Sequence, residues 1–164
     1  MSPLPLDPCQ NVAADFYGPL PTGQTLMVVI DEYSRFVEVE IVSSTSAAAA
    51  IPKLDKIFAT HGIPDLLKTD NGPPFTSHAF KVFARELGFK HRKVTPLWPK
   101  ANAEAERFIR TLGKAIRTAR TEQKNWEKEL QKFLRNYRST PHSSTGKSPA
   151  ELLMGRQIDQ NQTP

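Results

Sequence analysis

The feature that most constrains the fold is a pair of strand patterns of different kinds, separated by four residues. The segment TLMVVID, residues 25–31, is a continuous apolar run, as expected of a strand buried on both faces. The segment FVEVEIV, residues 36–42, alternates apolar and acidic side chains, which is the pattern of a half-buried strand. A third strand candidate, NVAADFYG, precedes them at residues 11–18. The tight links predict an antiparallel meander of three strands.

After the meander the sequence alternates helices and strands and then becomes helical. We expect a helix that Ser46 caps and Gly62 ends, in which Pro52 either introduces a kink or marks the true first turn. Further on, the patterns predict strands at 65–70 and 89–94, and helices at 78–87, about 102–122, 124–139 and after Ser148. Three strands followed by this α-β-α-β-α order predict a mixed α/β sheet with helices on its faces.

The length of 164 residues suits one domain, which we expect to span residues 10–156. Residues 1–9 are proline-rich and residues 157–164 are polar, so both ends are interpreted as linkers. No apolar run is long enough to cross a membrane. The single Cys9 precludes an internal disulfide, and the scattered histidines do not have zinc-site spacing. The net charge of +5 favours a polyanionic partner.

Three aspartates are candidates for binding a divalent cation, because Mg²⁺ and Mn²⁺ prefer carboxylate oxygens on rigid elements. Asp15 is a lone acid inside a strand pattern, although a solvent-facing strand end would also explain it. Asp31 closes the apolar strand, where capping of the following turn explains it better than metal binding does. Asp70 ends a strand, where ligands gather in α/β sheets, but Asp-Asn-Gly is also a standard turn signal.

Two glutamates occur in KANAEAERFIR, residues 100–110, and helical geometry separates them. At 100° per residue, Glu104 lies roughly 160° around the helix from Glu106. Glu106 alone shares its face with a basic stripe, whose members repel one another unless a polyanion binds. Although charged helix faces are usually only solvated, this stripe indicates nucleic-acid contact. The polar and basic residues of this face are Asn102, Arg107, Arg110, Lys114, Arg117 and Arg120.

Two further segments are candidates for DNA contact. Lys90, Arg92 and Lys93 form a second basic cluster, or else protect an edge strand by charge. The connection 95–102 contains Trp98 and Lys100, which would face the substrate if this loop borders the site. A buried anchor is the other interpretation of Trp98.

Several motifs, taken together and in order, resemble the catalytic core of a retroviral or long-terminal-repeat retrotransposon integrase of the gypsy type. They are DFYGPLP, VVIDEYSRFVE, HGIPDLLKTDNGPPF, LWPKANAEAERFIRTL and NYRSTPHSSTGKSPAELLMGR. The resemblance implies a ribonuclease H-like fold whose two aspartates and glutamate are Asp15, Asp70 and Glu106, with 35 residues between the last two. It also implies two bound Mg²⁺ or Mn²⁺ ions. It favours Asp15 over Asp31 as the first aspartate of the metal site.

The same resemblance implies a polynucleotidyl transferase that processes DNA 3′ ends and inserts retroelement DNA into host DNA in the nucleus. Its implied partners are double-stranded DNA and a second copy of the chain. Ala103 departs from the family pattern, which has glycine there, and Pro74 replaces a more usual polar residue. The alternative function is a host-domesticated, integrase-derived module that binds DNA or protein with reduced or no catalysis.

Overall fold

The computed structural model describes residues 7–94, 99–143 and 145–155, and of residues 99–106 it describes the backbone only. The chain divides into two compact units, Met1–Leu97 and Trp98–Pro164. The expected linkers lie largely outside the described residues.

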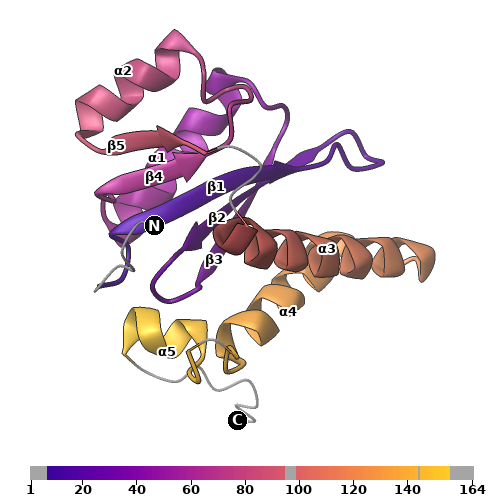
Figure 1. Cartoon of the computed structure of the whole chain (residues 1–164). Coiled ribbons are helices and arrows are strands. Elements are labelled where there is room, and N and C mark those ends of the chain that lie inside the picture. Colours follow the sequence, from indigo (N-terminus) through magenta and orange to yellow (C-terminus); the bar gives the residue numbers. More distant parts are fainter. Residues whose placement is uncertain (1–6, 95–98, 144, 156–164) are drawn as a thin grey trace. The chain divides into compact units, whose positions relative to one another are not determined.

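The first unit is built on a five-stranded sheet in the order β3-β2-β1-β4-β5 (Figure 1). The first three strands form the predicted antiparallel meander, whereas β4 and β5 join it in parallel. The predicted mixed sheet is therefore confirmed. β5 is an edge strand with three exposed basic residues, as the charge-protected interpretation requires. The strands are β1 (Asn11–Tyr17), β2 (Thr25–Asp31), β3 (Val37–Val42), β4 (Leu66–Thr69) and β5 (Lys90–Lys93).

Two capped helices, α1 (Ala47–His61) and α2 (His78–Leu87), connect the strands that follow the meander. Ser46 accepts a hydrogen bond from the backbone of the first turn of α1, and Gly62 ends the helix as predicted. Pro52 lies inside α1, so it does not mark the first turn. The core on the helix side of the sheet contains Val12, Ala14, Met27, Val29, Val42, Ala50, Leu54, Ile57, Phe58, Leu67, Phe75, Phe80, Phe83, Ala84 and Phe89.

The alternating strand β3 does not simply turn its glutamates to solvent. Glu38 lies across from Val29, a core residue, so both side chains are on the face that α1 covers. His61 Nε2 lies 3.1 Å from Glu38 Oε1, and Lys56 Nζ lies 3.4 Å from Glu40 Oε1. The period-two pattern therefore located the strand correctly, while α1 supplies basic partners to its polar face.

The second unit consists of α3 (Pro99–Thr121), α4 (Trp126–Ser139) and α5 (Pro149–Met154). Asn125 caps α4 by accepting from two backbone N–H groups, which is why this helix begins two residues later than expected. The ring centroid of Phe108 on α3 lies 5.6 Å from that of Phe133 and 4.9 Å from that of Tyr137, both on α4. Within the described part of the chain, no helix is both long and apolar enough to span a membrane.

Candidate active site

The strand register brings two of the predicted acids to adjacent positions. β1 and β4 are parallel neighbours that pair Ala13 with Lys68. Continued by two positions, this register sets Asp15 beside Asp70, at the carboxyl end of β4. Because neighbouring strands are about 4.8 Å apart, carboxylates at these positions can reach one cation. The two acids are 55 positions apart in sequence, so the crossover through α1 creates this proximity.

Asp15 lies on the face of β1 opposite the core. Val12 and Ala14 belong to the core cluster, and side chains alternate along a strand, so Asp15 points to the other face. Its Oδ1 accepts a hydrogen bond of 2.8 Å from the backbone N–H of Phe16. The ring of Phe16 in turn lies 5.4 Å from Phe75, a fully buried residue of the loop after β4. The residue after Asp15 therefore packs, on the core side, against the loop that follows Asp70.

Asp70 is both a turn residue and an exposed carboxylate. Its Oδ1 accepts a 2.9 Å hydrogen bond from the backbone N–H of Gly72, which closes the turn predicted from Asp-Asn-Gly. A Cβ at position 72 would lie 3.2 Å from this oxygen, so glycine permits the close approach. The turn interpretation is confirmed. It is compatible with metal binding, because the turn fixes the direction of an exposed carboxylate.

Asp31, the rival of Asp15, has a structural role. Its Oδ2 accepts from the backbone N–H and the hydroxyl of Ser34, at 3.1 and 2.6 Å. Its Oδ1 accepts from the backbone N–H of Cys9 at 2.9 Å, and the residue is only 5% exposed. The turn-capping interpretation of Asp31 is confirmed.

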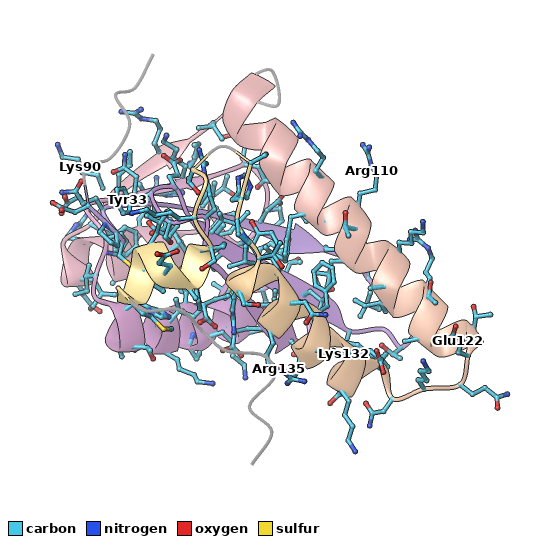
Figure 2. The ribbon with its side chains drawn as sticks, turned by 90° about the horizontal axis from the view of Figure 1, so that it is seen from below. Tyr33, Lys90, Arg110, Glu122, Lys132 and Arg135 are labelled. Atoms are coloured by element: carbon cyan, nitrogen blue, oxygen red, sulfur yellow. The ribbon has the colours of Figure 1, made fainter. Side chains whose placement is uncertain are left out.

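The helix α3 has the two faces that its sequence predicts. Phe108, Leu112, Ile116 and Ala119 are buried. Arg110 projects outward (Figure 2), and the other described members of the basic stripe are also exposed. These members are Arg107, Arg110, Lys114, Arg117 and Arg120. The side chains of Lys100, Asn102 and Glu106, and all of Trp98, lie outside the described residues.

A buried ion pair near the two aspartates was not predicted from the sequence. Lys68 precedes Asp70 by two residues, and its Nζ lies 3.0 Å from Glu32 Oε1 and donates to Oε2 at 3.2 Å. The pair joins β4 to the turn after β2 across 36 positions, so no local pattern signals it. It places one cationic side chain on the strand that leads to Asp70.

The described side chains contain no group of three or more histidine, cysteine or acidic residues that could hold a metal ion. They do present Asp15 and Asp70, whose oxygen donors on neighbouring strands suit Mg²⁺ or Mn²⁺. The donor set therefore fits a divalent cation in the part of the site that is described.

Comparison with known proteins shows the family to which the chain belongs. Residues 8–99, more than half of the chain, match the family described as the integrase core domain. The chain belongs to the integrase core family. This match contains both Asp15 and Asp70, and it ends before Glu106.

Two relatives, one from an animal and one from an endogenous virus, are similar to most of the chain. The uncharacterized protein K02A2.6 of Caenorhabditis elegans is 39% identical over 95% of the chain. The Pol polyprotein of feline endogenous virus ECE1 is 32% identical over 79% of the chain. The chain spans only 12% and 13% of the length of these two proteins.

Solved structures agree on the fold. The integrase catalytic core domain of HTLV-2, in its trimeric form with magnesium, aligns with a TM-score of 0.75 at 19% identity. That alignment covers 90% of this chain and 98% of the HTLV-2 chain. The catalytic core domain of BIV integrase gives 0.74 at 19% identity, covering 90% and 95%. The ribonuclease H-like integrase core fold is therefore confirmed.

Proposed function

We propose that this integrase core is a metal-dependent polynucleotidyl transferase that processes retroelement DNA ends and joins them to host DNA. The observation that carries the proposal is the parallel register of β1 and β4, which sets Asp15 beside Asp70 when it is continued by two positions. The competing acid, Asp31, is engaged in a buried turn. Glu106 completes the catalytic set on the strength of its sequence spacing and helical face.

Asp15, Asp70 and Glu106 would hold two Mg²⁺ or Mn²⁺ ions. When bound, these ions supply activation of the attacking oxygen and stabilisation of the charge that develops on the phosphate. The protein contributes rigid placement: Asp15 is held by a paired strand, and Asp70 by the hydrogen bond from Gly72. The attacking group is water in end processing and a DNA 3′-hydroxyl in strand transfer.

The proposed substrate is double-stranded DNA, bound in part by α3. Support comes from the exposed Arg107, Arg110, Lys114 and Arg117, which follow Glu106 along the helix. Trp98, Lys100 and Asn102 complete the proposed DNA-binding set. We further propose a homodimer or larger assembly acting in the host nucleus. Support for an assembly comes from HTLV-2 integrase cores, described in dimeric and trimeric forms, and from the simian T-cell lymphotropic virus intasome.

A manganese-dependent disintegration assay tests the proposal. We expect Asp15→Asn, Asp70→Asn and Glu106→Gln each to lower the rate by roughly three orders of magnitude. The three carboxylates act as a unit, so the loss of any one of them removes most of the activity. Asp65→Asn is a matched control for Asp70, since Asp65 is an exposed acid just before the other end of β4. Glu104→Gln is the control for Glu106, and both controls should retain activity.

Three outcomes would contradict parts of this proposal. Activity that survives Glu106→Gln would overturn the mechanism, and equal losses in Glu104→Gln and Glu106→Gln would overturn the helical-face assignment. DNA binding without any activity in the wild-type full-length protein would favour a domesticated binding module instead. Thermal melting of each variant separates loss of chemistry from loss of folding.

A further inference from the structure

A hydrogen-bonded chain leads from the edge strand of the sheet to the backbone of Asp70. The hydroxyl of Thr69, the last residue of β4, donates to the carbonyl oxygen of Asp70 at 2.9 Å. The same hydroxyl lies 2.7 Å from Nε2 of His91, on β5. Thr69 is only 2% exposed, so these contacts are largely shielded from water.

The directions of these hydrogen bonds are fixed by the number of available protons. A hydroxyl has one proton, and Thr69 gives it to the Asp70 carbonyl. Toward His91 the hydroxyl oxygen must therefore accept, so Nε2 carries a hydrogen and donates. Burial, and next the charge of Lys93, lower the pKa of His91. The imidazole is therefore neutral near pH 7, with its single proton on Nε2.

The ring of His91 is held by aromatic neighbours. Its centroid lies 4.9 Å from that of Phe80 on α2 and 6.2 Å from that of Phe75. Both phenylalanines are fully buried core residues. The core therefore fixes the orientation of the imidazole, and with it the donor that faces Thr69.

Asp70 needs this support because it lies where the sheet ends. A backbone hydrogen bond of 2.7 Å runs from the N–H of Val94 to the carbonyl of Thr69, the last residue of β4. From there the backbone of Asp70 is held through its carbonyl by Thr69, while its carboxylate is held by Gly72. Loss of the Thr69 contact would remove one of the hydrogen bonds that hold the peptide after β4.

We propose that His91 is a positioning residue that acts through Thr69 to orient the Asp70 carboxylate for a divalent cation. The inference rests on the proposed function, since it assigns Asp70 to the metal site. His91 contacts Thr69, and its contribution is to the geometry of Asp70. Groups that orient a metal ligand typically affect metal affinity by about 10- to 100-fold.

The test measures Mn²⁺ binding to the full chain without DNA, by electron paramagnetic resonance of the free ion. His91→Phe keeps an aromatic ring among Phe75 and Phe80 but removes the donor, whereas His91→Gln keeps an N–H donor. Thr69→Val has nearly the same shape without the hydroxyl, and Thr69→Ser keeps it. We expect His91→Phe and Thr69→Val to weaken Mn²⁺ binding about tenfold, and the two conservative variants to stay within about threefold of wild type. The double variant His91→Phe/Thr69→Val should resemble either single one, because both break the same chain.

Asp70→Asn distinguishes failure of this inference from failure of the proposed function. If Asp70→Asn leaves Mn²⁺ binding unchanged, Asp70 is not a ligand and both fail. If Asp70→Asn weakens binding but His91→Phe and Thr69→Val do not, the positioning role alone is overturned. Equal loss in His91→Phe and His91→Gln would also overturn it, because the ring rather than the donor would then matter. Thr69→Val, with almost no change in volume, keeps the test decisive if a His91 variant fails to fold.

Discussion

Asp15 and Asp31 lie on adjacent antiparallel strands, yet their carboxylates have different partners. Asp31 is buried and accepts three hydrogen bonds, one from Cys9 and two from Ser34. Its carboxylate therefore stabilises the turn after β2. Asp15 lies on the sheet face opposite the core, beside the position of Asp70. Residue type alone does not separate these roles. Position in the fold does: Asp31 is 5% exposed and solvated by protein donors, whereas Asp15 is on the other face of the sheet from the core cluster.

At the residue scale, burial and the charge of Asp31 together disfavour the thiolate form of Cys9. Burial, and next the charge of Asp31, raise the pKa of the Cys9 thiol to about 11. Because the thiolate is the nucleophile, alkylation by iodoacetamide should rise with pH up to about 11. Asp31→Asn should shift this midpoint downward, since it removes a negative charge, while burial keeps it above that of a free thiol. Mass spectrometry of the alkylated fraction against pH measures the shift, with Cys9→Ser as background. A wild-type midpoint near about 8.5 would contradict the prediction.

At the scale of elements, helix bounds were predicted best from the sequence where capping residues mark both ends of the helix. α2 was predicted with its observed bounds, because Ser77 caps it and Gly88 adopts the left-handed conformation after it. The meander was predicted from its strand patterns and short links. The partners of Glu38 and Glu40 were not, because they come from α1 and depend on how the helix packs across the sheet.

The sequence proposes the residues of the candidate site, but it does not show how they are arranged. The strand-end positions of Asp31 and Asp70 follow from local patterns, and the resemblance to integrases favours Asp15. Their adjacency depends on the parallel pairing of β1 with β4, which no local period reveals. His91 was missed for the same reason: it lies in a basic edge strand, where charge masks a single inward-facing ring.

The packing of α2 gives a stability prediction at this scale. Phe80 is fully buried, and its ring centroid lies 5.2 Å from that of Phe75 and 5.8 Å from that of Phe83. Phe80→Ala should lower the free energy of unfolding by about 3–5 kcal/mol, because it removes a large core side chain and leaves a cavity. Its neighbour Lys81 is exposed, so Lys81→Ala should change stability by less than about 0.5 kcal/mol. Urea denaturation followed by circular dichroism measures both, and similar effects in the two variants would contradict the packing of α2.

At the scale of the whole molecule, the net charge of +5 is not sufficient to define a DNA-binding surface. Basic residues also occur on α1, α2 and α4, where many adjoin acids: Lys56 meets Glu40, and the first turn of α4 contains Glu127 and Glu129. The exposed face of α3 differs because Arg107, Arg110 and Lys114 recur along it. A spatially repeated positive charge suits a phosphate backbone, which repeats at regular intervals.

Salt dependence distinguishes this surface from general basicity. Each phosphate contact that is lost should reduce the slope of log affinity against log salt concentration by about 1. Arg110→Ala and Lys114→Ala should therefore each lower the slope for double-stranded DNA by about 1, and together by about 2. Lys132→Ala is the matched control, because it removes the same charge from an exposed position on α4 (Figure 2). If DNA binding reflects net charge alone, all three single variants will weaken binding equally. A selective effect of the α3 variants, measured by fluorescence anisotropy from low to physiological salt, would assign the phosphate contacts to the helix that carries Glu106.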